Sequence, residues 1–122
     1  MHNMSLWKEL AQEVILFSLL SFSIVLLQSS NTLALIVLLT IAIATLGLWH
    51  DRYDRWSFVI VAVFGTCAEV FFVHYGVWEY SHPATLGIPI WFPVAFGTSA
   101  LIGARLIRTV TRTKTFSQKL KD

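Results

Sequence analysis

The stretch that decides the fold is SFVIVAVFGTCAEVFFVHYGVW, residues 57–78, an almost wholly apolar run with one acid, Glu69, inside it. About 20 apolar residues, at the 1.5 Å rise of an α-helix, cross the hydrocarbon core of a bilayer. Further runs of this kind occupy residues 12–28, 32–49 and 90–107. Only helices and closed barrels satisfy their backbone groups in lipid, and these runs lack the alternation of barrel strands. The sequence therefore predicts an all-α fold, a four-helix transmembrane bundle with antiparallel neighbours.

The composition supports the same class of protein. The chain of 122 residues is 56% hydrophobic and 13% charged, with a mean hydropathy of +0.67, whereas a soluble domain carries roughly 25% charged residues. The apolar residues come in blocks rather than in amphipathic stripes, which disfavours a soluble bundle. We expect residues 1–107 to form one transmembrane domain and residues 108–122 to form a basic, solvated cytoplasmic tail.

The positive residues predict the orientation. With four spans, the N-terminus, the 50–56 connection and the C-terminus share one side of the membrane, and the 29–31 and 79–89 connections share the other. All nine lysines and arginines fall on the first side. The positive-inside rule then places both termini in the cytoplasm of a multi-pass protein, in a bacterial-type inner or plasma membrane. The basic residues do not form a nucleic-acid surface, so we expect no nucleic-acid partner.

Small residues predict where the helices pack. Lipid removes the hydrophobic drive between helices, so close backbone approach depends on small side chains. The last run carries them at intervals of four, and the third run presents Glu69 on one face with two small neighbours. The predicted helix-packing residues are Gly65, Ala95, Ser99 and Gly103.

Glu69 is the main candidate for a functional residue because it lies near the middle of its run. A charged side chain at that depth costs about 2.5–3.5 kcal/mol on insertion scales. It could carry a proton, act as a general acid, or anchor a lipid headgroup or a sterol-like hydroxyl. The alternative is a structural carboxyl that hydrogen-bonds a neighbouring helix.

Aromatic residues gather around the 79–89 connection, where they could line a pocket or simply lie among headgroups. Together with Glu69 they make up the predicted ligand-binding set: Glu69, Thr66, Trp78, Tyr80, Trp91, Phe92 and Ser99. His74 and His82 have no metal-binding spacing, and no nucleotide-binding signature is present, so we expect neither a metal nor a cofactor.

The stretch from Val73 to Arg108 resembles the last helical hairpin of the Insig (insulin-induced gene) membrane proteins and their bacterial relatives. Two elements carry the resemblance, a Gly-Val-aromatic-x-Tyr-Ser/Thr-x-Pro element and a Trp-x-Pro-x-x-Phe element. In this chain they are Gly76, Val77, Trp78, Tyr80, Ser81 and Pro83, then Trp91, Pro93 and Phe96. The likeness covers about a third of the chain and leaves the rest unmatched. It implies a helical bundle that binds a sterol or another lipid.

These observations leave three hypotheses. The leading one is a non-enzymatic integral membrane protein that binds a lipid or a partner membrane protein between its third and fourth helices. The second is a small proton-coupled transporter that uses Glu69, and the third is an intramembrane lipid-modifying enzyme with Glu69 as general acid. We name no catalytic residue, because no second group is predicted to converge on Glu69. Membrane lipids are the expected partners, and a thin bundle is also compatible with a homodimer.

Overall fold

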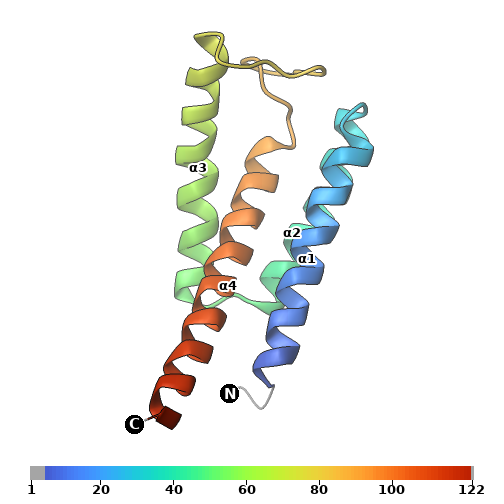
Figure 1. The fold of residues 1–122 in the computed structure, drawn as a ribbon. Helices are drawn as coiled ribbons and strands as arrows, with labels where there is room; N and C mark the ends of the chain where they lie inside the picture. The colour runs from blue at the N-terminus through green and yellow to red at the C-terminus, as the bar shows by residue number, and fades with distance from the viewer. Residues whose placement is uncertain (1–4, 122) are drawn as a thin grey trace.

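The computed structural model describes the backbone of residues 5–121 and the side chains of residues 5–112. It contains four α-helices, α1 (Leu6–Leu27), α2 (Asn31–Leu48), α3 (Arg52–His74) and α4 (Phe92–Lys121), and no strand within residues 5–121 (Figure 1). The predicted all-α fold is therefore confirmed. Three of the helices, α1, α2 and α3, are long and apolar enough to cross a membrane.

Local signals in the sequence explain where the first three helices begin. The side chains of Ser5 and Ser30 accept hydrogen bonds from the backbone N–H groups three residues later, at the starts of α1 and α2. At the start of α3, Asp51 and Asp54 form a reciprocal capping box, in which each carboxylate accepts the other residue's backbone N–H. Such caps satisfy N–H groups that have no partner within the helix.

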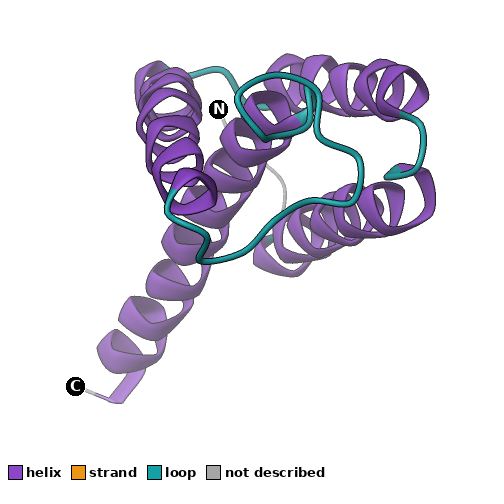
Figure 2. Ribbon diagram, turned by 90° about the horizontal axis from the view of Figure 1, so that it is seen from above, coloured by secondary structure: helices purple, strands orange, loops and turns teal. Residues whose placement is uncertain are grey.

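Helix α4 is the centre of the bundle. It packs against each of the other three helices, most extensively against α3, while α1 and α2 pack against each other. In Figure 1 the start of α1 and the end of α4 lie at the same end of the bundle, opposite the connection formed by residues 75–91. Figure 2 views this connection from above, where it passes over the ends of the helices. We call the two ends the terminal end and the connection end.

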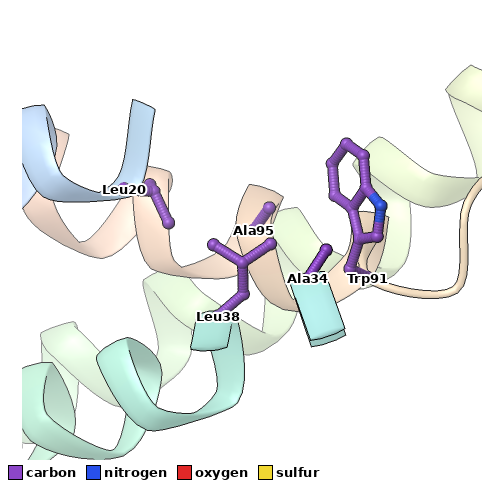
Figure 3. Close-up of a cluster of buried hydrophobic side chains, with 5 residues drawn as sticks. All are labelled: Leu20, Ala34, Leu38, Trp91 and Ala95. Atoms are coloured by element: carbon purple, nitrogen blue, oxygen red, sulfur yellow. The ribbon is translucent and has the colours of Figure 1, made fainter. Parts of the chain in front are cut away.

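The core lies where α4 meets α1 and α2. One cluster joins side chains from these three helices and from the last residue of the connection, and Figure 3 shows its members: Leu20, Ala34, Leu38, Trp91 and Ala95. A second cluster joins Trp49 to Leu101 and Ile102 on α4. Many large apolar side chains on α1, α2 and α3 are exposed. Lipid tails can cover such surfaces in a membrane protein.

Several helix boundaries differ from the predicted ones. Helix α1 begins at Leu6 and α3 at Arg52, before residues 12 and 57, so that residues 52–56 of the predicted 50–56 connection are helical. Helix α3 ends at His74 instead of residue 78, because Gly76 adopts a positive φ of 73° and closes the helix. Glu69 therefore precedes the end of α3 by only five residues and lies near the connection end, away from the middle of the helix.

Residues 108–121 of the predicted solvated tail belong to α4, and the solvated character of residues 113–122 stays a prediction. Helix α4 continues without a break to Lys121, and no proline follows Pro93 to stop it. The tail's first residues lie within the bundle, where Arg108, Thr109 and Arg112 contact other helices. The side chains of residues 113–122, including Lys114, lie outside the described part of the structure.

Candidate functional site

The site is built around the carboxylate of Glu69, a residue of α3 that is 9% exposed. The indole Nε1 of Trp78 donates a hydrogen bond of 2.6 Å to its Oε1, and the phenol of Tyr80 donates one of 2.5 Å to the same oxygen. At 1.5 Å per residue, the Cα of Glu69 lies about 7.5 Å from the end of the helix. An acid and two aromatic donors thus meet at the connection end.

The end of α3 brings Trp78 back toward Glu69. The backbone N–H of Val77 bonds the carbonyl of Phe72 at 3.0 Å, and the N–H of Gly76 bonds the carbonyl of Val73 at 3.1 Å. This is the Schellman arrangement, which needs a left-handed residue that glycine supplies without strain. The chain reverses there, and the Trp78 ring packs on Phe72 with centroids 5.4 Å apart.

Tyr80 links the acid to the start of α4, because its ring meets Phe92 edge-on at 6.3 Å. Burial raises the pKa of the Tyr80 phenol, and the hydrogen bond to Glu69 and the charge of that residue raise it further. The phenol therefore stays protonated at neutral pH and serves as a hydrogen-bond donor.

The two oxygens of Glu69 differ in their surroundings. Oε1 accepts both aromatic hydrogen bonds, whereas Oε2 accepts none from the described residues. Oε2 is also not among the fully buried polar atoms that lack a partner, so it keeps some accessible surface. Protein groups hold one oxygen in place, and the other is free to bind an incoming donor.

A tight turn folds the rest of the connection onto α3. Leu86 and Gly87 both have positive φ, 55° and 81°, between the paired residues Thr85 and Ile88. This matches a type I′ turn. A Cβ on Gly87 would lie 2.7 Å from Cγ1 of Val73, so only glycine allows this approach. The side chain of Asn31 also donates to the carbonyl of His82 at 3.1 Å and ties the connection to α2.

Two neighbouring hollows lie between the turn and α3. The first, of about 240 Å³, is lined by Thr66 and Val70 of α3, by residues of the turn and by Pro93. The second, of about 620 Å³, is lined on α3 by Cys67, Val70 and Phe71 among others. Both hollows share Val70 and Leu86 and are lined mainly by apolar side chains.

The structure brings together four of the predicted ligand-binding residues and separates the other three from them. Those that meet are Glu69, Trp78, Tyr80 and Phe92. Thr66 lies one turn deeper and lines the smaller hollow. Trp91 belongs to the core cluster with α1 and α2, and half-buried Ser99 forms no hydrogen bond to Glu69.

The predicted packing face of α4 is corrected. Ala95 lies in the core cluster with α1 and α2, and a Cβ added to Gly103 would meet nothing within 4 Å. Helix α4 turns Gly97 toward α3 instead, against the Phe58 carbonyl and the Ala62 side chain. Gly65 of α3 faces the ring of Phe96 on α4, which covers it so closely that a Cβ would collide.

The structure contains a polar cluster at the terminal end that the predicted site did not include. Asp54, which is fully buried, accepts hydrogen bonds of 3.1 and 2.6 Å from Arg105 and one of 2.6 Å from Arg108. Asp51 lies 3.3 Å from Arg105, and the Arg105 guanidinium lies 5.5 Å from the centroid of Trp49. In the sequence, the feature that pointed to these two acids was the spacing Asp51-x-x-Asp54 before an apolar run. This spacing is typical of a capping box at the start of a helix.

Helix α1 contributes two more buried acids to this end. Glu9 accepts two hydrogen bonds of 3.1 Å from Arg112, and Glu13 accepts one of 2.8 Å from Thr109. Their separation by four residues on one helix was a signal for a shared face.

Comparison with known proteins supplies no relative: no family model, curated protein or solved structure matches this chain. The site is therefore interpreted from its own chemistry.

Proposed function

We propose that this chain is a small, non-enzymatic integral membrane protein that binds a lipid between α3 and α4 through the carboxylate of Glu69. The observation that carries this proposal is the unequal use of the two oxygens. Trp78 and Tyr80 hold Oε1, and Oε2 remains available for a hydroxyl or an ammonium group. A carboxylate oxygen is a strong acceptor for either donor.

The surroundings suit a ligand that is polar at one end and apolar along its length. Aromatic rings of the kind found at membrane interfaces surround the acid. Two hollows between the connection and α3, neither of them lined by Glu69 itself, offer mainly apolar walls. The resemblance of residues 73–108 to a lipid-binding family points in the same direction.

We further propose that α4 is a fourth span and that both termini lie in the cytoplasm. Residues 92–107 would cover about 24 Å at 1.5 Å per residue, and the aromatic residues of the connection would extend the span. The hydropathy of α4 is lowered mainly by Arg105 and Arg108, which are paired with buried Asp54 at the terminal end. A helix that is surrounded by protein needs fewer lipid-facing apolar side chains.

The test compares the lipids that co-purify with the wild-type protein, Glu69→Gln and Glu79→Gln. Glutamine keeps a carbonyl oxygen for Trp78 and Tyr80 but replaces the free acceptor with an N–H₂ donor. Glu79 is exposed on the same connection and serves as the matched control. We expect native mass spectrometry to show a retained lipid with the wild type and the control, and its loss with Glu69→Gln.

Equal lipid retention by all three proteins would refute the proposal. A partner membrane protein that leaves the complex only in Glu69→Gln, with no change in lipid content, would show that a protein occupies the site instead.

A further inference from the structure

Three arginines of α4 line a hollow of about 370 Å³ at the terminal end of the bundle. They are Arg105, Arg108 and Arg112, and Asp51 and Thr111 complete the lining. Residues three and four apart lie on one face of a helix, so this spacing places the three arginines on the same side of α4. The lining carries three positive charges and one negative charge, unlike the mainly apolar hollows at the connection end.

The three arginines differ in how far they are open to solvent. The side chain of Arg105 is 11% exposed, whereas those of Arg108 and Arg112 are 39% and 47% exposed. Arg105 gives two hydrogen bonds to buried Asp54, which suits a role in packing. Arg108 and Arg112 are the arginines that a molecule entering the hollow can contact.

Arg108 and Arg112 also keep hydrogen-bond donors that no described residue uses. A guanidinium group carries five N–H donors in a planar fork. In Arg112, Nη2 makes both hydrogen bonds to Glu9, and Nε and Nη1 make none to the described residues. In Arg108, Nη2 bonds Asp54, and Nη1 lies 3.5 Å from Asp51 without a hydrogen bond to it. The Arg108 Nη1 atom is not among the fully buried polar atoms without a partner, so it keeps accessible surface.

The acids beside these arginines hold them in place. Buried Asp54 and Glu9 each bond one side of a guanidinium group, that of Arg108 and that of Arg112. The acids also offset part of the positive charge, so the hollow attracts an anion only weakly from dilute solution. A phosphate that is confined to a membrane surface is already at a high local concentration, and a weak site is enough to bind it.

The hollow lies at the level expected for phospholipid headgroups. Exposed aromatic side chains are typical of membrane interfaces. Trp7, Tyr53 and Trp56 are exposed at the starts of α1 and α3, at the terminal end (Figure 1). In the proposed four-span arrangement, α4 leaves the hydrocarbon core near residue 107, among the three arginines. Basic pockets between membrane helices on the cytoplasmic side are typical sites for phosphate-bearing headgroups.

We propose that this hollow binds the phosphate of an anionic phospholipid through Arg108 and Arg112. The phosphate oxygens accept hydrogen bonds from the unused N–H groups, because the planar guanidinium fork matches the geometry of a phosphate. The acyl chains lie outside the hollow, along the exposed apolar side chains of the helices. The inference uses the proposed position in the membrane and does not involve Glu69.

Two phospholipids that differ only in their headgroups test the inference. Dioleoylphosphatidylglycerol has a net negative charge, and dioleoylphosphatidylcholine has the same chains and phosphate with a compensating quaternary ammonium. Native mass spectrometry of the detergent-solubilised protein, titrated with each lipid, measures both affinities. We expect the wild type to prefer phosphatidylglycerol. Arg112→Gln should bind this lipid about ten-fold more weakly, the effect of losing one charge-assisted hydrogen bond.

Glu9→Gln separates phosphate binding from helix packing. It breaks the same ion pair between α1 and α4 as Arg112→Gln does, but it keeps the arginine and removes a competing carboxylate. Its affinity for phosphatidylglycerol should therefore equal or exceed that of the wild type. The control for net charge is Arg55→Gln, at an exposed residue of the same end that does not line the hollow, and it should keep the wild-type affinity.

Three outcomes would overturn the inference. They are equal binding of the two lipids by the wild type, an unchanged affinity in Arg112→Gln, and a loss in Glu9→Gln as large as that in Arg112→Gln. Displacement of phosphatidylglycerol by an equal concentration of inorganic phosphate would assign the hollow to a soluble phosphate and overturn its assignment to a lipid. Glu69→Gln should leave the preference for phosphatidylglycerol unchanged, so failure of this inference is distinguishable from failure of the proposed function.

Discussion

The two ends of this bundle both contain buried acids, but they use them differently. At the terminal end, Asp54 is bonded by Arg105 and Arg108, and Glu9 by Arg112. At the connection end, the donors that bond Glu69 among the described residues are the neutral groups of Trp78 and Tyr80. Arginine side chains on α4 thus hold helices together at one end, while the acid at the other end keeps an oxygen available.

The difference shows that burial of an acid does not by itself identify a functional residue. Breaking a buried ion pair is strongly destabilising, because it leaves an uncompensated charge, so paired acids are well suited to a structural role. An acid held by neutral donors and open on one side can instead exchange partners. The partners of each acid therefore decide which role it suits.

The largest effect is expected at the terminal end, from Asp54→Ala. The change leaves Arg105 and Arg108 without their buried partner and removes half of the capping box with Asp51. The free energy of unfolding should fall by about 3–5 kcal/mol. Thermal unfolding in detergent, followed by circular dichroism, measures the loss. The control is Arg55→Ala, at an exposed neighbouring residue, and its free energy of unfolding should change little. Equal stability of the two variants would contradict the structural role of Asp54.

A smaller effect is expected from a methyl group added between α3 and α4. In Gly65→Ala the new Cβ would overlap the ring of Phe96, and such overpacking costs about 1–3 kcal/mol. In Gly103→Ala the same methyl meets nothing within 4 Å, and the higher helix propensity of alanine should stabilise α4 by up to about 1 kcal/mol. The difference between the two melting temperatures checks the corrected packing face. Equal shifts in both variants would contradict it.

At the connection end, Trp78→Phe should affect lipid binding more than stability. The variant keeps an aromatic ring beside Phe72 but loses the N–H that holds Glu69 Oε1. One hydrogen bond is worth about 1 kcal/mol, so lipid affinity should fall about five-fold. Trp7→Phe, an exposed tryptophan at the other end, is the matched control. An unchanged lipid titration in Trp78→Phe would show that this hydrogen bond does not position the acid.

The smallest effect concerns the pH dependence of Tyr80. Because burial and Glu69 raise the pKa of its phenol, the folded protein favours the protonated form. Its contribution to stability is complete below about pH 10, the pKa of a free tyrosine, and is lost as the pH rises through the higher folded value. The difference in phenolate absorbance between the wild type and Tyr80→Phe isolates this group. A transition at or below pH 10 would contradict the contact with Glu69.

Much of the fold could be predicted from single residues and short spacings. The apolar runs, the short 29–31 connection and the position of Pro93 in the first turn of the last helix each depend on local chemistry. The grouping of Glu69 with Trp78 and Tyr80 was also accessible, since all three lie within a few turns of each other in the sequence. The ion pairs were not, because Arg105 and Asp54 lie 51 residues apart, and Arg112 and Glu9 lie 103 residues apart.

The amino-acid sequence by itself determined that the chain forms apolar helices and that its positive residues gather at one end. The tertiary structure decided which face of α4 meets α3, how far α4 extends, and which acids are paired. The physical reason is that a helix with apolar residues on every side carries no periodic signal for its rotation. Only the packing of one helix on another selects that rotation, and with it the partner of every buried polar group.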